Sequence, residues 1–220
     1  DRLFGQYNHT VAQMLLTWED FDHENRLHNL QNTLERLLQL HAIPIINEND
    51  PVACEEYSLG DNDTLAALVA KCIHADLVVL MSDIDGLYTA DPHTHPDAKL
   101  IPVVEEITPE VIEMAGGAGS SLGTGGMATK LQAAQVAMSA GVNMVIASGS
   151  EEGVLRRILK GEEVGTVFPA RESHLRVRKS WLAFGKRLQG DLVVDAGCVK
   201  ALEGGSSLLA AGIKIGRAHV

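Results

Sequence analysis

Hydrophobic positions along the chain alternate between two spacings. Short apolar runs that end in polar residues are typical of buried strands in a parallel sheet; they occupy residues 11–17, 43–47, 76–83, 142–147 and 165–168. Between them, apolar residues three or four positions apart predict amphipathic helices; these cover residues 18–40, 65–72, 131–142 and 153–160. Thr108 followed by Pro109 is a helix-start signal. The order predicts an α/β fold with an open, mainly parallel sheet sandwiched by helices.

Composition changes after this pattern ends, which predicts a domain boundary. Six Arg or Lys residues, together with Trp181 and Phe184, lie within residues 171–187, and a β-like, glycine-containing stretch follows from Gly190. We therefore expect a first domain over residues 1–170, a linker over 171–189 and the start of a small β-rich domain over 190–214. The last segment is too short to form a core of its own.

Polar side chains gather where predicted strands end. The strand 43–47 leads into Asn47–Asp50, residues 60–63 read Gly-Asp-Asn-Asp, and the strand 76–83 ends in Ser82 and Asp83. The carboxyl ends of strands are where open α/β sheets bind ligands. Asp61 or Asn62 is also suited to cap the following helix. One cap explains one residue and leaves the rest of the group unexplained, so we favour a ligand site.

A glycine-rich stretch, residues 122–130, precedes the helical pattern that starts at Leu131. It reads Leu-Gly-Thr-Gly-Gly-Met-Ala-Thr-Lys. Glycines that run into a helix start let free N–H groups converge on an anion, and Lys130 adds a mobile positive charge. These features predict a nucleotide-phosphate site; an ordinary glycine-rich loop is the alternative.

Two known phosphate loops do not fit this stretch. The Walker pattern requires Gly-Lys-Ser/Thr, whereas Lys130 follows Thr129 and precedes Leu131. Gly123, Gly125 and Ala128 satisfy the dinucleotide fingerprint in form, but that motif must follow a buried strand. The preceding residues, 116–121, are too rich in glycine and serine for a strand. We expect a phosphate loop of another type.

Charge and cysteine content narrow the class of protein. The net charge of −11 over 220 residues argues against a broad nucleic-acid surface. No apolar run reaches the length of a membrane span, and the start carries no signal-peptide pattern. Three scattered cysteines, Cys54, Cys72 and Cys198, lack metal-type spacing and are expected to be reduced thiols of a cytoplasmic protein. His93 and His95 are expected to be solvated loop residues rather than a metal pair.

Four segments together resemble those of the amino acid kinase family and, within it, the glutamate 5-kinases. They are residues 43–50, 60–63, 81–92 and 122–149. The resemblance implies an amino acid kinase-like fold and the transfer of a phosphoryl group from ATP to the side-chain carboxylate of L-glutamate, the first step of proline biosynthesis. The stretch from Gly190 resembles the first part of a PUA domain. We also expect a homo-oligomer, and the charge and the lack of a long apolar run argue against nucleic-acid and membrane partners.

The resemblance further implies roles for individual residues. Asp50 and Asn62, with Asp61, would bind glutamate. Lys130 and Asp63 would be catalytic residues, Lys130 by neutralising charge on the transferred phosphoryl group. Asp61 and Asp63 would organise the site and its Mg²⁺ ion, with no residue assigned as a direct metal ligand. ATP would be bound by residues at the end of one strand and in the glycine-rich stretch: Ser82, Asp83, Thr124, Gly125, Gly126, Met127, Ala128, Thr129 and Lys130.

The chain departs from the family pattern at two places. We expect it to lack the family's first strand, with a phosphate-binding lysine, and a later Ser-Gly-Ala segment. Residues 215–220 do not continue the PUA pattern and are expected to be a non-native tail, with genuine divergence as the alternative.

Other functions stay open from the sequence alone. One is another amino acid kinase, acting on acetylglutamate, aspartate, carbamate or a nucleoside monophosphate. A second is an RNA-binding module, which only the basic residues between Arg171 and Arg187 support. A third is an inactive fragment.

Overall fold

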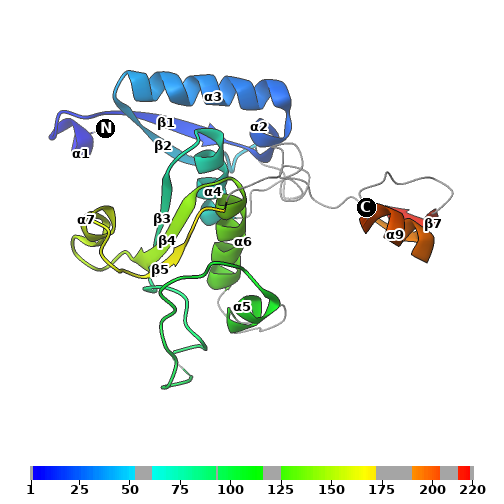
Figure 1. The fold of residues 1–220 in the computed structure, drawn as a ribbon. Coiled ribbons are helices and arrows are strands. Elements are labelled where there is room, and N and C mark those ends of the chain that lie inside the picture. Colours follow the sequence, from blue (N-terminus) through cyan, green and yellow to red (C-terminus); the bar gives the residue numbers. More distant parts are fainter. Residues whose placement is uncertain are drawn as a thin grey trace. The chain divides into compact units, whose positions relative to one another are not determined.

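The computed structural model describes residues 2–52, 61–92, 94–115, 125–171, 190–203 and 213–218. The chain forms two compact units, Asp1–Phe184 and Gly185–Val220, drawn in sequence colours in Figure 1. The division falls inside the predicted linker, residues 171–189.

The described strands of the first unit lie in two sheets. In one sheet, β1 (Thr10–Leu16) pairs in parallel with β2 (Ala42–Glu48). In the other, β3 (Leu77–Ser82) pairs in parallel with β4 (Asn143–Ser148), and β5 (Thr166–Phe168) pairs antiparallel to β4. These strands match the five apolar runs of the sequence, with ends that shift by one or two residues.

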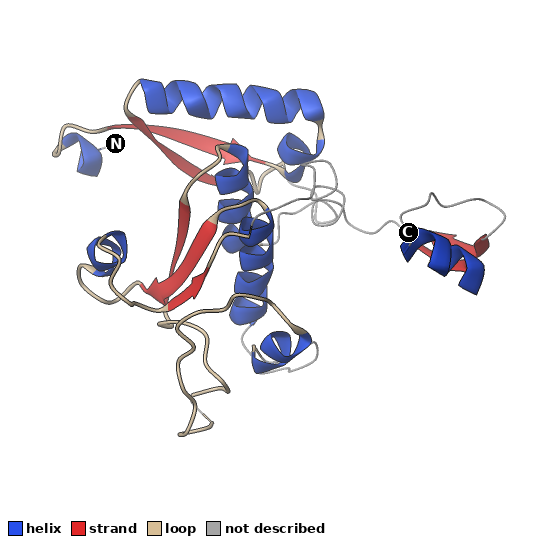
Figure 2. Cartoon of the chain, viewed as in Figure 1, coloured by secondary structure: helices blue, strands red, loops and turns tan. Residues whose placement is uncertain are grey.

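Helices cover the sheets and connect the strands, as the coloured cartoon in Figure 2 shows. The bounds in the first unit are α1 (Arg2–Gly5), α2 (Trp18–Asp22), α3 (Glu24–Gln39), α4 (Asn62–Cys72), α5 (Pro109–Met114), α6 (Gly125–Ser139) and α7 (Val154–Leu159). Thr108 caps α5 and Pro109 is its first residue, as predicted.

The prediction of one helix over residues 18–40 is wrong. His23 has an extended backbone, with φ −97° and ψ 122°, and separates α2 from α3. The break leaves both Phe21 of α2 and the stripe of Leu30 and Leu34 on α3 buried. One continuous helix would have to bring Phe21 into the same 3.6-residue pattern as this stripe.

Helices α4 and α6 pack against each other beside the strands, and α4 also contacts β2 and β3. Their small, fully buried alanines, Ala67, Ala133 and Ala137, allow this close approach. The side-chain amide of Gln31 on α3 donates to the Cys72 carbonyl at 3.1 Å, which ties α3 to the end of α4. Burial, together with the charge of Glu35, raises the pKa of the Cys72 thiol to about 11, so this thiol stays protonated at neutral pH.

An apolar groove of about 350 Å³ lies between β2 of one sheet and β3 of the other, beside α4. Its lining includes Pro44 and Ile46 of β2, Leu77 of β3 and Val69 of α4.

The second unit contains a hairpin-like strand pair and a helix. β6 (Gly190–Val194) pairs antiparallel to β7 (Ile213–Ala218), and α9 (Ala196–Glu203) lies between them in the sequence. The Asp195 carboxylate caps α9 by accepting from the Cys198 N–H at 2.7 Å. β7 includes four of the residues predicted to be a non-native tail; their origin stays a prediction, as does the PUA-like identity of this unit.

Among the described helices of both units, none combines the length and the apolar character needed to cross a membrane.

Candidate functional site

An ion pair joins the N-terminal parts of the two central helices, α4 and α6. Lys130 lies one turn into α6, and its Nζ is 2.8 Å from Oδ2 of Asp63 in the first turn of α4. The two side chains are only 12% and 22% exposed. A Cβ at Gly126 would lie 4.0 Å from the same Nζ, so the ammonium group lies beside the first turn of α6. The structure therefore brings together the two residues predicted to be catalytic.

Asp61 caps α4, as the sequence suggested. Its Oδ1 accepts hydrogen bonds from the N–H groups of Asp63 at 2.8 Å and Thr64 at 3.0 Å. Asn62 is the first helical residue; it is exposed and lines the groove beside Ile46. Capping fixes the backbone from which Asp63 reaches Lys130.

The carboxyl ends of β3 and β4 meet at one edge of their sheet. The Gly149 N–H donates to the Ser82 carbonyl at 2.7 Å, and Ser82 Oγ donates to Asp83 Oδ1 at 2.9 Å. The hydrogen bond from Ser82 is the main reason that the pKa of the Asp83 carboxyl is lowered, with further contributions from backbone N–H groups and the positive charge of Lys130. Asp83 thus lies in the electrostatic field of Lys130.

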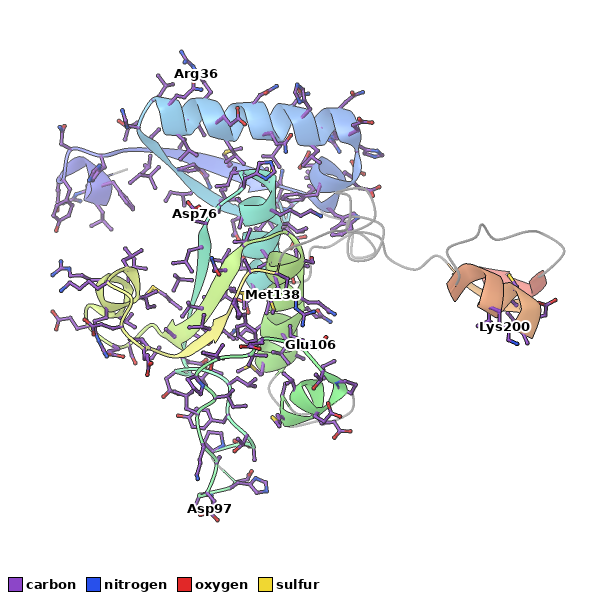
Figure 3. All side chains as sticks on the ribbon, viewed as in Figure 1. Arg36, Asp76, Asp97, Glu106, Met138 and Lys200 are labelled. Carbon is purple, nitrogen blue, oxygen red and sulfur yellow. The ribbon has the colours of Figure 1, made fainter. Side chains whose placement is uncertain are left out.

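A pocket of about 960 Å³ opens at these strand ends. One wall is a long connection between β3 and α5, residues 84–107, which we call the arm. Figure 3 marks Asp97 at its far end. Helix α5, Met127 of α6 and the end of β4 supply the rest; the lining residues are Asp83–Pro92, His95, Glu110, Glu113–Ala115, Met127, Ser148 and Glu151. A volume of this size is typical of small-molecule sites.

Most of the pocket lining was not assigned from the sequence. Asp83 and Met127 were assigned to the site, but Asp85 and Tyr88 were not. Tyr88 Oη donates to Asp85 Oδ2 at 2.9 Å, and this hydrogen bond is the main cause of a raised Tyr88 pKa. Their position directly after a buried strand could have identified them, because the same position identified Ser82 and Asp83.

Other predicted site residues are not brought to the pocket. Asp50 lies in the turn after β2 with an exposed side chain, and Ala128 is exposed on α6. Thr129 Oγ1 donates to the Gly126 carbonyl at 3.0 Å within α6. Gly125 is the first residue of that helix. Residues 116–124, which include Thr124 and the beginning of the glycine-rich stretch, lie outside the described residues.

The arrangement is suited to bind an anion with a bulky organic part. A helix N-terminus favours negative charge, and α6 is 15 residues long with Lys130 in its second turn. The adjoining pocket offers apolar surface and several oxygen acceptors. Within the described part of the chain, no group of three or more His, Cys, Asp or Glu side chains is placed to hold a metal ion.

Comparison with known proteins adds three findings. The family model described as the amino acid kinase family matches residues 1–148. The glutamate 5-kinase of Moorella thermoacetica is 50% identical over 214 residues, which are 97% of this chain and 57% of that protein. The glutamate 5-kinase of Deinococcus radiodurans is 51% identical over 209 residues, covering 94% of this chain and 57% of its own length. The chain thus spans little more than half the length of the curated relatives it matches.

Two solved structures have a similar fold. The UMP kinase of Bacillus anthracis matches with a TM-score of 0.52 and 19% identity over 76% of this chain and 61% of its own. The isopentenyl phosphate kinase of T. acidophilum matches with a TM-score of 0.51 and 18% identity over 74% of this chain and 61% of its own. At this identity the likeness concerns the fold alone, and it confirms the predicted α/β fold class.

Proposed function

Since this chain belongs to the amino acid kinase family, we propose that it is part of an enzyme that transfers the γ-phosphoryl group of ATP to the side-chain carboxylate of L-glutamate. The product would be glutamyl 5-phosphate, which places the reaction at the first step of proline biosynthesis. Identities near 50% to glutamate 5-kinases over almost the whole chain support this substrate.

The contact between Lys130 and Asp63 is the observation that carries the proposal. An ammonium group at the start of α6 is suited to neutralise charge on a transferring phosphoryl group. The Asp63 carboxylate, 2.8 Å away, holds the ammonium group in place. A group fixed before the reaction does not have to reorganise as charge develops, so this pairing supports a catalytic role for Lys130 and a positioning role for Asp63.

The chemistry requires little else from the protein. A glutamate carboxylate is ionised at neutral pH and attacks phosphorus directly, so no general base is needed. One carboxylate oxygen forms a bond to the γ-phosphorus while the bond from that phosphorus to the ADP oxygen breaks. Catalysis then depends on alignment of the two substrates and on donors directed at the phosphoryl oxygens. We assign glutamate binding to Asp50, Asp61 and Asn62, which lie after β2 and at the start of α4.

We assign the nucleoside part of ATP to the pocket of about 960 Å³ beside Asp83, and its phosphates to the start of α6. Ser82, Thr124, Gly125, Gly126, Met127, Ala128 and Thr129 belong to this half of the proposed site. Mg²⁺ usually binds through one or two carboxylates together with substrate phosphates. Asp61 and Asp63, at the start of α4, would organise the site for an ion that arrives with the nucleotide; bound there, it would neutralise phosphate charge.

The remaining parts of the proposal concern the setting of the enzyme. A cytoplasmic location agrees with the free, buried thiols of Cys72 and Cys198. Assembly into a homo-oligomer, and a PUA-like domain beginning at residue 190, are also proposed.

An acyl phosphate trap tests the function. The full-length gene product is incubated with ATP, Mg²⁺ and hydroxylamine, and the hydroxamate is measured with L-glutamate, L-aspartate or N-acetylglutamate as acceptor. With UMP as acceptor, the release of ADP is measured instead. We expect hydroxamate with glutamate well above every other acceptor. Faster product formation with aspartate or acetylglutamate, or ADP release driven by UMP, would replace the proposed substrate with that acceptor.

A further inference from the structure

The arm leaves the sheet and returns to it at one place, beneath the pocket. Its outgoing part, which follows β3, carries the pocket residues Asp85, Leu87 and Tyr88. Its returning part runs antiparallel to the first, with Leu100 bridged to Tyr88 and the Ile101 N–H donating to the Leu87 carbonyl at 2.8 Å. We call the place where these two parts lie side by side the base of the arm. The position of this base determines the position of the pocket wall.

Thr166 of β5 joins both parts of the base with a single hydroxyl group. Its Oγ1 accepts a hydrogen bond from the Leu87 N–H at 2.8 Å and donates one to the Ile101 carbonyl at 2.7 Å. Thr166 is completely buried. Among the described residues, it is the only polar or charged residue that is buried. A buried hydroxyl that both accepts and donates leaves neither backbone group unsatisfied.

Gly86 allows the arm to approach this hydroxyl closely. A Cβ at Gly86 would lie 2.5 Å from Thr166 Oγ1 and 2.7 Å from Leu100 Cδ1, so only glycine allows the arm to lie this close to β5. Two further hydrogen bonds fix the returning part: Val167 N–H to the Pro102 carbonyl at 2.8 Å, and Val104 N–H to the Val167 carbonyl at 2.9 Å.

We propose that Thr166 is a positioning residue for nucleotide binding, which acts by holding the base of the arm so that Leu87 and Tyr88 line the pocket. This inference rests on the proposed function, because it takes the pocket to be the site of the nucleoside part of ATP. Thr166 does not line the pocket, so its effect passes through the Leu87 N–H and the Ile101 carbonyl. Sequence position gave no hint of this role, since 79 residues separate Thr166 from Leu87.

Loss of the Thr166 hydroxyl should affect the binding of the two substrates differently. Tyr88 and Asp85 stand on the arm, whereas Lys130 and Asp63 stand on α6 and α4. Loss of the Thr166 hydroxyl should therefore loosen the nucleotide wall and leave the ion pair in place. A purely structural role would instead lower overall stability and affect both substrates alike.

Thr166→Val and Thr166→Ser separate these outcomes, because valine keeps the shape and loses the hydroxyl while serine keeps the hydroxyl. Thr33→Val is the matched control; Thr33 is exposed on α3, and within the described part of the chain its hydroxyl bonds only the Asn29 carbonyl of its own helix. The readouts are the Kd for ATP–Mg²⁺ by calorimetry, the KM for each substrate, and hydrogen exchange of the amides of Leu87, Thr89 and Ile101, all on the full-length gene product.

We expect Thr166→Val to raise both the Kd and the KM for ATP about tenfold. The KM for glutamate and kcat should stay within about twofold of wild type. Exchange at the arm amides should accelerate while β3 and β4 stay protected, and Thr166→Ser and Thr33→Val should resemble wild type. An unchanged ATP Kd in Thr166→Val, or equal rises in both KM values with faster exchange throughout the sheet, would overturn the inference. If the wild type binds ATP without phosphorylating glutamate, the proposed substrate fails, and the ATP Kd and exchange data still decide the role of Thr166.

Discussion

Lys130 Nζ and Asp63 Oδ2 are 2.8 Å apart although 67 residues separate them in the chain. The pair connects the N-terminal turns of α6 and α4, which pack side by side. With side chains only 12% and 22% exposed, each charge depends on the other for compensation, because water reaches them poorly. Asp83 lies near enough for Lys130 to lower its pKa, so one ammonium group influences carboxylates from two elements.

Removing either member of this pair should abolish most of the activity. We predict that Lys130→Met lowers kcat at least about 100-fold, the usual cost of losing one donor to transition-state charge. Asp63→Asn should have a similar effect, and the double variant should be no worse than Lys130→Met alone, because Asp63 acts through Lys130. The control is Arg26→Met on α3, which removes surface ion pairs with Glu19 and Asp20 and should leave kcat within about twofold of wild type.

Stability must be measured beside activity for these variants. Asp63→Asn leaves a poorly solvated ammonium group without its partner, so we expect a loss of about 1–3 kcal/mol in the free energy of unfolding. If a variant with wild-type stability kept full activity, the pair would have no catalytic role. Additive losses in the double variant would show that the two residues act independently.

Gly165, which precedes β5, should tolerate no side chain. Its φ is +67°, and an added Cβ would lie 2.0 Å from the Ile146 carbonyl oxygen. We predict that Gly165→Ala lowers the free energy of unfolding by at least about 3 kcal/mol, since backbone would have to move. Gly161→Ala is the matched control: its φ is +78° with nothing within 4 Å, so only the left-handed conformation is penalised, at about 1 kcal/mol. Urea unfolding measures both, and equal losses would contradict the role of the close contact.

Asp61 has two proposed roles that substitutions can separate. Asp61→Ala should lower the free energy of unfolding by about 1 kcal/mol, because two N–H groups of α4 lose their acceptor. Serine also caps helices, so Asp61→Ser should keep the stability of wild type. If Asp61 also binds glutamate, Asp61→Ser will raise the glutamate KM about tenfold despite its normal stability. A wild-type KM in this variant would leave capping as the only role of Asp61.

The fold was largely predictable from the sequence because its strands are short apolar runs with clear polar ends. The position of Thr108 before Pro109 likewise indicated α5 correctly. The break at His23 was not predictable, because the leucine pattern continues past it. Nor could the sequence pair Lys130 with Asp63, or bring Thr166 under the arm, since these contacts depend on how separate elements pack. The strand-end rule found Ser82 and Asp83, and applied consistently it would also have found Asp85 and Ser148.

The pH dependence of Asp83 provides a test of the local electrostatics. Its pKa is lowered in the folded chain, chiefly by the Ser82 hydroxyl, so the folded state binds fewer protons there than the unfolded state. The resulting stabilisation is present above the unfolded pKa of about 3.9 and is lost as the pH falls through the folded pKa. We predict that Ser82→Ala raises the Asp83 pKa, measured by carboxyl NMR titration, and makes acid unfolding less steep.

Ser139→Ala is the control for that titration, because Ser139 also loses a hydroxyl hydrogen bond, to the Val136 carbonyl at 2.9 Å on α6. It should leave Asp83 unchanged. Lys130→Met should raise the Asp83 pKa less than Ser82→Ala does. The reverse order would mean that the charge of Lys130, rather than the Ser82 hydroxyl, dominates at Asp83.

The fate of the carboxylate oxygen tests the proposed reaction most directly. The full-length gene product is supplied with ATP, Mg²⁺ and L-glutamate labelled with ¹⁸O in its side-chain carboxylate, and hydroxylamine cleaves the product at its carbonyl carbon. If a carboxylate oxygen attacks the γ-phosphorus, the phosphate released will carry one ¹⁸O atom, visible by ³¹P NMR or mass spectrometry. We predict this label in wild type and at least about a 100-fold slower appearance of it in Lys130→Met. Glutamate-dependent phosphate release without ¹⁸O would contradict phosphoryl transfer to the side-chain carboxylate.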